Sequence, residues 1–210
     1  MKIEELLEQA MKKSKDFDPE VLVKELAVNH YLPKSVGVND IRDKKGTGNY
    51  CWFPGFIELL KPKMVVELGS AMGVGTVCML ASFYKDFDLY GVTLAENGLE
   101  FCYVKKDEYP NFHPLVGDYM DLSIWPKDVE LSQTDFWYID GLHEGEHVRE
   151  QLLLYQPFFK EGTIIAFDDV FINTSMEEMW SDIENIIPVV YKTTLPLHYT
   201  GWGIIQIGKK

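Results

Sequence analysis

The feature that most constrains the fold is an apolar run that ends in an acid and leads through glycines into a helical pattern. Residues 63–76 read KMVVELGSAMGVGT, with Glu67 near the end of the apolar run. Glycine tolerates positive φ angles and lets a ligand approach backbone N–H groups closely. An acid at this place can accept hydrogen bonds from the ammonium or hydroxyl groups of a ligand. The segment predicts a strand, a turn and a helix that together bind a small molecule.

Short apolar runs alternate with helical patterns over the rest of the chain. The runs that read as strands cover residues 63–68, 88–93, 112–116, 134–140 and 162–168, and a final pair covers 188–194 and 202–208. The helical patterns cover residues 74–84, 98–108, 144–159 and 175–186. Such alternation predicts parallel strands with right-handed crossovers, and the short last link favours an antiparallel pair. We expect an α/β fold: a Rossmann-like, doubly wound, mostly parallel seven-stranded sheet with one antiparallel strand and helices on both faces.

The first 49 residues differ from the remainder. Residues 2–13 and 19–28 read as helices, whereas residues 29–49 are polar, contain three glycines and read as a loop. Such a loop is either a solvated connector or a lid over the site. Apolar helical periodicity resumes over residues 50–60. We expect residues 1–49 to form a helical extension with a candidate lid, and residues 50–210 to form one ligand-binding domain.

The charge balance disfavours several classes of partner. With 33 acidic against 20 basic residues, the formal net charge is −13, which argues against nucleic acid and anionic membranes as partners. The three cysteines lack metal-ligand spacing, and their odd number and scatter argue against a disulfide framework. No stretch reads as a signal peptide or a membrane span. We expect a cytoplasmic protein that acts on a small molecule, with homo-oligomers left open.

Acidic residues follow most of the predicted strands. Those at the strand ends or just beyond them are Glu67, Glu96, Asp118, Asp140, Asp168 and Asp169. Ligands of an open α/β sheet bind at the carboxyl ends of its strands, so we expect these acids to gather around one site. Each acid alone could instead cap the next helix. The carboxylates of Asp140, Asp168 and Asp169 are the sharpest subset, because all-oxygen ligands suit Mg²⁺, Ca²⁺ or Mn²⁺.

His143 lies three residues beyond Asp140 and is a candidate general base, because histidine accepts a proton near neutral pH. It also opens a literal H-E-x-x-H pattern that ends at His147, which on a helix would indicate a zinc protease. Three features count against zinc. The pattern directly follows a predicted strand, Gly145 is unfavourable inside a helix, and the surrounding carboxylates suit harder cations.

Two further segments carry a resemblance to a known family. Residues 136–143 read FWYIDGLH, and residues 160–170 read KEGTIIAFDDV. Together with residues 67–76 and Gly117-Asp118, they resemble class I S-adenosylmethionine (SAM)-dependent methyltransferases. The similarity is greatest to metal-dependent small-molecule O-methyltransferases of the catechol type and of the macrolide-sugar and glycopeptide-tailoring type. The resemblance covers about residues 61–170, and five matched segments in the right order are more specific than any one of them.

The resemblance implies roles for individual residues. Those implied to contact SAM are Glu67, Gly69, Ser70, Gly73, Glu96, Asp118, Tyr119 and Asp140. Asp118 would receive the adenine amino group, with Tyr119 beside the ring. Asp140, Asp168 and Asp169 would hold a divalent metal, with Mg²⁺ the expected ion, and His143 would be the catalytic base. The implied reaction is metal-assisted O-methylation of a small-molecule hydroxyl. The aromatic residues Tyr50, Trp52 and Trp202 are candidates to shape the acceptor pocket, although the helical spacing of Trp52 favours the core.

Some residues depart from the family pattern. Thr93 stands where many relatives have an acid for the ribose hydroxyls, and Glu96 is a candidate replacement. Ala71 and Gly75 depart from the commonest form of the glycine motif. Two alternatives therefore stay open: a relative that binds SAM or a metal without methylating, and a nicotinamide-dependent oxidoreductase. The second is weakened because the glycine spacing does not match G-x-G-x-x-G.

Overall fold

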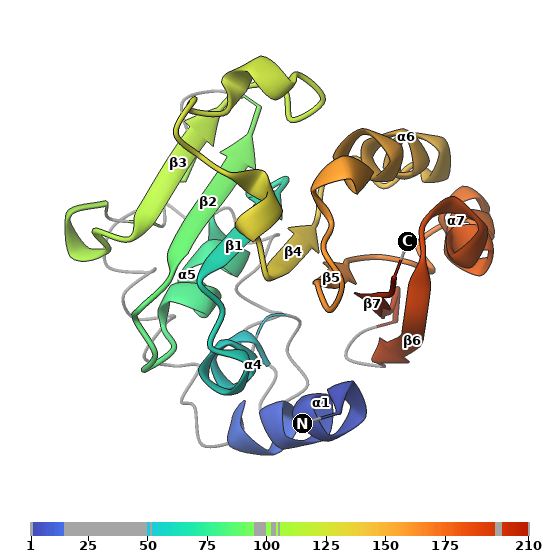
Figure 1. The fold of residues 1–210 in the computed structure, drawn as a ribbon, viewed down its shortest axis with the longest axis horizontal. Helices are drawn as coiled ribbons and strands as arrows, with labels where there is room; N and C mark the ends of the chain where they lie inside the picture. The colour runs from blue at the N-terminus through green and yellow to red at the C-terminus, as the bar shows by residue number, and fades with distance from the viewer. Residues whose placement is uncertain are drawn as a thin grey trace.

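The computed structural model describes residues 2–14, 50, 52–94, 100–101, 104, 106–195 and 199–209. These residues contain one seven-stranded sheet, which runs diagonally across the molecule (Figure 1). The strands are β1 (Met64–Leu68), β2 (Asp88–Thr93), β3 (Phe112–Val116), β4 (Phe136–Ile139), β5 (Ile164–Phe167), β6 (Val189–Leu195) and β7 (Trp202–Ile207). Every residue of β1, β4 and β5 is buried, as expected for strands that helices cover on both faces.

The strand order is β3-β2-β1-β4-β5-β7-β6. Strands β1 to β5 run parallel to one another, and β7 is antiparallel to both β5 and β6. The predicted fold class, with its one antiparallel strand, is confirmed. The chain order reverses between β1 and β4, and in open α/β sheets ligands bind outside the carboxyl ends of the strands at such a reversal. The topology therefore indicates where a site should lie.

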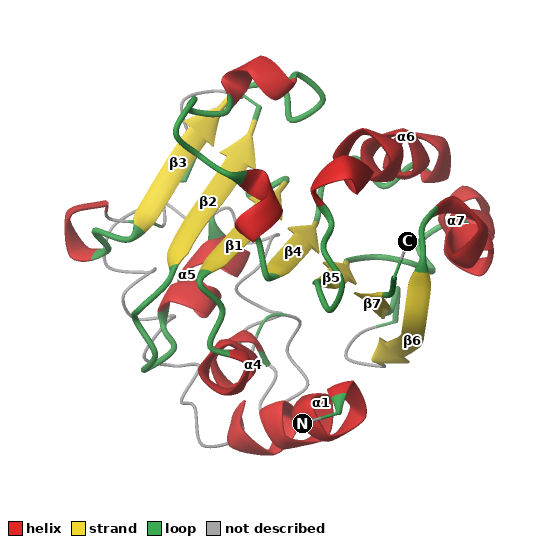
Figure 2. Ribbon diagram, viewed as in Figure 1, coloured by secondary structure: helices red, strands yellow, loops and turns green. Residues whose placement is uncertain are grey.

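Helices cover the two faces of the sheet (Figure 2). One face packs against α1 (Ile3–Ser14), α4 (Phe53–Leu60) and α5 (Val74–Leu80), and the other packs against α6 (Gly145–Tyr155) and α7 (Thr174–Ile186). Each layer of helices encloses its own apolar cluster. Trp52 and Trp202 are 1% and 0% exposed within the first cluster, so both belong to the core, as the helical spacing favours for Trp52, and not to an exposed pocket wall.

The first helix packs tightly on α4. Ala10 is fully buried, and Ser14 donates its hydroxyl to the carbonyl of Trp52 at 3.0 Å. A Cβ placed on Gly55 would lie 2.6 Å from the carbonyl oxygen of Ala10, so only glycine allows this approach. Helix α1 thus contributes to the core that the rest of the described chain forms. The predicted helix over 19–28 and the candidate lid over 29–49 lie outside the described residues, so the proposed domain boundary stays a prediction.

Two predicted helices differ in the structure. Within the predicted helix over 98–108, Phe101 has a left-handed φ of 52°, and a short 3₁₀ turn covers Lys106–Glu108. Phe101 instead donates its backbone N–H to the carbonyl of Ala71 and packs its ring on Phe112. The predicted helix over 144–159 ends at Tyr155 and continues as a 3₁₀ turn over Gln156–Phe158, which contains a proline. In the described ranges, no helix is long and apolar enough to cross a membrane.

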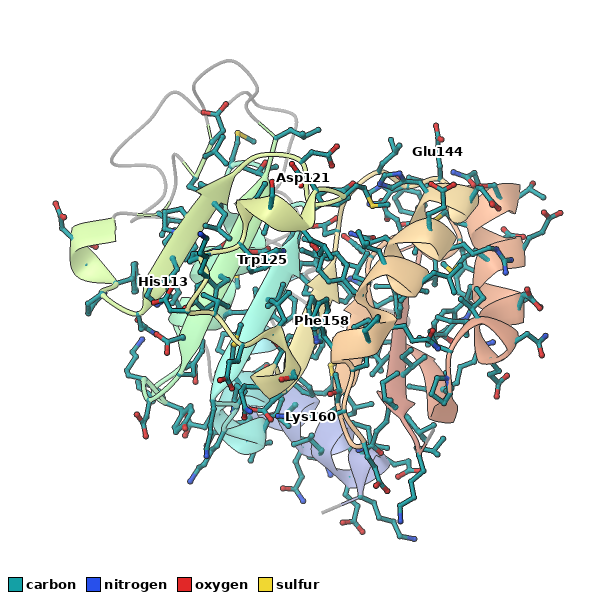
Figure 3. The ribbon with its side chains drawn as sticks, turned by 45° about the horizontal axis from the view of Figure 1, so that its top comes forward. His113, Asp121, Trp125, Glu144, Phe158 and Lys160 are labelled. Atoms are coloured by element: carbon teal, nitrogen blue, oxygen red, sulfur yellow. The ribbon has the colours of Figure 1, made fainter. Side chains whose placement is uncertain are left out.

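The two ends of the parallel strands differ in the charged residues that lie beside them. Figure 3 shows Asp121 beyond β3 and Glu144 beyond β4 on the side where the parallel strands end, and Lys160 towards the opposite side. Lys160 forms an ion pair with Asp135 at 2.8 Å, just ahead of β4 and β5. The acidic residues that the sequence predicts for the site lie at or just after the strand ends, so they belong to the side of the sheet where the parallel strands have their carboxyl ends.

Candidate active site

The turn after β1 requires unusual backbone angles. Gly69 and Gly73 have φ values of 101° and 90°, and Ala71 has 44°. The N–H groups of Gly69 and Ser70 both donate to the carbonyl of Val92 on β2, at 2.9 and 3.0 Å. A Cβ on Gly69 would lie 2.1 Å from the carbonyl oxygen of Asp140. Glycine at position 69 therefore brings three strand ends into contact at the reversal of strand order.

Glu67 is the second-last residue of β1, beneath this turn, and is 1% exposed. Its Oε2 accepts a hydrogen bond from the hydroxyl of Thr76, and a Cβ on Gly75 would lie 2.4 Å from Oε1. Burial raises the pKa of Glu67 to about 8; the hydrogen bond from Thr76 lowers it, and the charge of Asp140 raises it further. The carboxyl group is thus held at the first turn of α5 and favours a nearby positive charge.

Asp140 follows β4 and is fixed by its neighbours. Its backbone N–H donates to the carbonyl of Leu68 at 2.9 Å, which places it beside the end of β1. Its Oδ2 accepts hydrogen bonds from the hydroxyls of Tyr138 at 2.7 Å and Tyr50 at 3.2 Å. Tyr138 precedes Asp140 by two residues and therefore lies on the same face of the strand. Its ring is stacked on Trp202 with a centroid distance of 5.0 Å, so the donor is held in a fully buried position.

The acids after β5 lie beside Asp140. Asp168 is 4% exposed, and its N–H donates to the carbonyl of Ile139 at 3.0 Å. Its Oδ2 lies 3.4 Å from the hydroxyl of Tyr138 and its Oδ1 accepts the N–H of Asp169 at 2.9 Å. Asp169 has a φ of 58°, a conformation that aspartate tolerates better than most residues, and its Oδ1 accepts the hydroxyl of Thr200. The adjoining ends of β4 and β5 therefore gather the carboxylates, as the sequence predicts.

His143 lies between two of these acids. Its Nε2 is 3.3 Å from Oδ1 of Asp140, and its Nδ1 is 3.1 Å from Oδ2 of Asp169. Burial lowers the pKa of His143, but the hydrogen bond to Asp140 and the negative charges of Asp140 and Asp169 outweigh it, so the net pKa lies above its ordinary value. The side chain is 29% exposed, which leaves the ring accessible from solvent.

The segment that carries His143 is anchored to α7. Asn173 accepts the N–H of Met176 at 2.9 Å as the N-cap of α7, and its Nδ2 donates to the carbonyl of His143 at 2.8 Å. Gly145 begins α6, and its N–H donates to the hydroxyl of Ser175 at 2.6 Å. A Cβ on Gly145 would lie 2.0 Å from the carbonyl oxygen of Ser175, so the two helix starts touch. These contacts set the position of the histidine.

The H-E-x-x-H pattern does not form a zinc motif. Helix α6 starts at Gly145, so His143 precedes the helix and faces the carboxylates. His147 lies within α6, and its Nε2 is 3.0 Å from the hydroxyl of Tyr119. The two histidines therefore have different partners. Within the described ranges, no cluster of three or more His, Cys, Asp or Glu side chains could hold a metal ion in the arrangement shown.

Tyr119 and Asp118 follow β3 at the other side of the turn. Asp118 is exposed, and its Oδ1 accepts the N–H of Met120 at 2.8 Å. Tyr119 is 6% exposed and points towards the loop after β4. Thr93 ends β2 and is 7% exposed. Glu96, the candidate replacement for a ribose-binding acid, lies outside the described residues.

A comparison with protein families finds a match over the middle of the chain. Residues 66–170, half of the 210-residue chain, match the family described as "Methyltransferase domain". The chain belongs to this methyltransferase family. The matched range contains the glycine turn and His143, and it ends just after Asp169, so it coincides with the region whose resemblance the sequence predicts. The predicted membership among methyltransferases is confirmed, and a comparison with curated proteins finds no match.

Solved structures share the fold of this methyltransferase. A methyltransferase of Podospora anserina, solved with S-adenosylhomocysteine (SAH), has a TM-score of 0.68 at 12% identity over 100% of this chain and 98% of the other. An O-methyltransferase of Bacillus cereus in complex with SAH has 0.60 at 13% identity over 90% of each chain. MycE, a methyltransferase of mycinamycin biosynthesis solved with Mg and SAH, has 0.50 at 15% identity over 73% of this chain and 47% of its own.

Several polar residues of this candidate site are not predicted from the sequence. Tyr138 could have been found, because it stands two residues before Asp140 on a strand and must share its face. Thr200 and Asn173 could not be found in this way. Thr200 donates to Asp169 from just ahead of β7, and Asn173 donates to the carbonyl of His143 from the N-cap of α7. Tyr50 was expected to shape a pocket, and its hydroxyl in fact bonds to Asp140.

Proposed function

We propose that this methyltransferase transfers the methyl group of SAM to a hydroxyl of a small molecule, assisted by a divalent cation. The observation that carries the proposal is the position of His143, which lies between two carboxylates at the edge where the glycine turn ends. A candidate proton acceptor, three carboxylates and a glycine turn therefore lie together, which supports the proposal. SAM-dependent O-methylation uses all three.

We assign the methionine end of SAM to the glycine turn. The cradle formed by Gly69, Ser70 and Gly73 leaves no room for a Cβ at position 69, and Glu67 is buried beneath it. A raised carboxyl pKa falls when a cation approaches, so the ammonium or sulfonium of SAM would favour the ionised form of Glu67. The described neighbours solved with SAH support this cofactor.

The adenine end of the cofactor is assigned to residues after β3. We assign the adenine amino group to the exposed carboxylate of Asp118, with Tyr119 alongside, and the ribose to Thr93 or Glu96. Asp140 also belongs to the cofactor-contacting set, because its backbone touches the turn at Gly69. A carboxylate can accept two hydrogen bonds from an amino or diol group, whereas threonine offers a single hydroxyl oxygen.

The acids Asp140, Asp168 and Asp169 are the residues that would hold the cation. Their donor set is all oxygen, which suits Mg²⁺, and MycE was solved with Mg. When bound, the cation would lower the pKa of the acceptor hydroxyl. His143 lies between Asp140 and Asp169, so the contact of its Nε2 with Asp140 must open before that carboxylate can turn to a cation, while Asp169 would offer its Oδ1 and keep Oδ2 on the ring.

His143 would then act as the general base. Its contact with Asp140 is the longer of the two, so Nε2 is the nitrogen more readily released to accept a proton. Asp169 would keep Nδ1 protonated and the ring oriented, as the third member of a catalytic triad does for its histidine. Neutralisation of the nearby carboxylates would lower the pKa of His143 and favour the neutral imidazole that a base requires.

A ligand panel tests the cofactor and the metal together. SAM, SAH and NAD are each added with and without Mg²⁺, and the melting temperature is recorded. SAM or SAH at 100 times its Kd should stabilise the fold by about 2.7 kcal/mol, whereas NAD should have no effect. A shift with NAD alone would overturn the assignment. A shift with SAM but no chelator-sensitive transfer to any hydroxyl acceptor would favour a relative that binds SAM without methylating.

The net charge of the protein bears on the class of acceptor and of partner. The net charge of −13 supports a small molecule over nucleic acid or an anionic membrane surface. A second structure of MycE contains Mg, SAH and mycinamycin VI, which supports a natural-product hydroxyl as the acceptor class. A cytoplasmic location and assembly into a homo-oligomer stay predictions. Salt-sensitive binding of DNA or RNA near physiological ionic strength would contradict the choice of partner.

A further inference from the structure

Tyr119 connects two loops that belong to different parts of the site. Its hydroxyl oxygen accepts the backbone N–H of Leu142 at 3.1 Å. The same hydroxyl lies 3.0 Å from Nε2 of His147. Because the phenol accepts from Leu142, its own hydrogen is free to be donated to His147. A single oxygen from the end of β3 thus joins the loop after β4 to helix α6.

The other end of Tyr119 is fixed as well. Its backbone carbonyl accepts the hydroxyl of Tyr155 at 2.6 Å, and Tyr155 in turn accepts the indole N–H of Trp125 at 3.1 Å. Both of these partners are buried. The ring of Tyr119 packs edge-on against His147 with a centroid distance of 5.6 Å. The hydroxyl therefore has little freedom to leave Leu142.

The loop after β4 leaves no space around this hydroxyl. A Cβ on Gly141 would lie 2.5 Å from the hydroxyl oxygen of Tyr119. The φ of Gly141 is not positive, so closeness to Tyr119 is the local reason for glycine here. In this loop Asp140 precedes Gly141, and Leu142 and His143 follow it. The contact with Tyr119 therefore lies between the proposed metal ligand and the proposed base.

We propose that Tyr119 is a positioning residue that ties the adenine end of the site to the loop carrying His143. Its neighbour Asp118 would meet the adenine, and its hydroxyl sets the backbone between the metal-binding acid and the base. Binding of the cofactor at Asp118 would thereby steady the base loop. This consequence rests on the proposed function, but the contact between Tyr119 and Leu142 can be tested without any cofactor.

Amide hydrogen exchange of Leu142, measured by NMR on the full chain without ligand, tests the contact. Tyr119→Phe keeps the ring and removes the acceptor, so exchange at Leu142 should accelerate about tenfold, as loss of one hydrogen bond implies. Tyr90→Phe is the matched control, since the ring of Tyr90 also packs against a histidine, His113, with a centroid distance of 4.5 Å. It should leave Leu142 unchanged. Equal exchange in wild type and Tyr119→Phe would overturn the proposal.

Gly141→Ala provides a second route to the same contact. Its new Cβ would displace the hydroxyl of Tyr119, so Leu142 should again exchange faster, and the variant decides the matter if Tyr119→Phe does not fold. In combination, the two substitutions should accelerate exchange by less than the product of their separate effects, because both remove one hydrogen bond. Unchanged exchange in Gly141→Ala would count against the proposal.

Addition of SAH then tests the coupling. In the wild type, SAH should slow the exchange of Leu142 and His143. In Tyr119→Phe, which keeps the ring proposed to lie beside the adenine, saturating SAH should no longer slow this exchange, whatever its affinity. Slowing equal to that of the wild type at saturation would show that the hydroxyl does not couple the two loops and would overturn the positioning role. If SAH does not bind the wild type, the proposed function fails, whereas the exchange of Leu142 without ligand still decides the role of Tyr119.

Discussion

The glycine turn after β1 and the acidic group after β4 and β5, which is Asp140, Asp168 and Asp169, both lie at the carboxyl ends of the strands. They are nevertheless held in different ways. Backbone geometry maintains the turn, through positive φ angles and N–H bonds from Gly69 and Ser70 to one carbonyl. Side chains maintain the acidic group, through hydroxyl donors and the imidazole of His143. The turn should therefore fail when a Cβ is added, and the acidic group when charge is removed.

The difference also separates the expected functions. The turn has few side-chain polar groups and a buried acid whose raised pKa favours a cationic ligand. The acidic group has a histidine already oriented between carboxylates, which suits proton transfer and cation binding. If the two regions act separately, a change in one should alter cofactor binding and a change in the other should alter the rate. Four substitutions test that separation, and the largest expected effect is given first.

Gly69→Ala should abolish SAH binding and strongly destabilise the fold. Its Cβ would lie 2.1 Å from the carbonyl oxygen of Asp140, and alanine is strained at a φ of 101°. Gly162→Ala is the matched control, because Gly162 has a φ of 88° but no atom within 4 Å of the added Cβ. It should cost only about 1 kcal/mol, measured by urea unfolding. Equal losses in the two variants would show that strain alone, and not the contact with β4, explains glycine at position 69.

His143→Gln should lower the rate of methyl transfer by about 10²–10⁴ with little change in SAM affinity, because only the general base is lost. The deficit should shrink as pH rises, since more of the acceptor hydroxyl ionises without help. The measurement is a pH–rate profile with an acceptor found by screening phenols, sugars and hydroxylated natural products. His147→Gln, at the other histidine of the pattern, should retain much more of the rate. Full activity of His143→Gln at neutral pH would make this histidine a bystander.

Asp168→Asn should weaken Mg²⁺ binding and activity together, by about tenfold or more, because the side chain keeps its shape and loses its charge. Excess Mg²⁺ should restore part of the rate. Asp182→Asn is the control, since Asp182 pairs with Arg149 at 2.8 Å on the face of α6 and α7 and should not affect the metal. If a chelator leaves wild-type methyl transfer unchanged, the metal assignment is wrong.

Glu67→Gln should change how stability depends on pH. The folded-state pKa of about 8 exceeds the ordinary value of 4.5, so the folded protein binds a proton that the unfolded chain releases. Stability of the cofactor-free protein should therefore fall as pH rises from about 4.5 to 8, and the substitution should reduce that fall by up to a few kcal/mol. Thermal unfolding at several pH values measures this. A pH profile identical to that of the wild type would show that Glu67 does not bind the extra proton.

The sequence predicts the sheet and much of the acidic group for a physical reason. The apolar run and the glycines after it mark where β1 ends. Because neighbouring strands are parallel, their carboxyl ends bring Asp140 and Asp168 to the same side of the sheet. It does not predict the partners that other elements supply, since nothing near Asp169 indicates that Thr200 will donate to it. It also leaves the place of Trp202 open, because an aromatic residue reads the same in a core as in a pocket, whereas the helical spacing of Trp52 already favours the core. The role of Tyr119 depends on a contact with Leu142, 23 residues away, which no local pattern encodes.

Calorimetric titration of SAH into the wild type, Gly69→Ala and His143→Gln tests the central claim most directly. If the turn binds the cofactor and the acidic group performs proton transfer, the wild type and His143→Gln should bind SAH with similar affinity. A folded fraction of Gly69→Ala should then show no binding. Failure of the wild type to bind SAH, or loss of binding in His143→Gln with binding retained in Gly69→Ala, would contradict this division of the site.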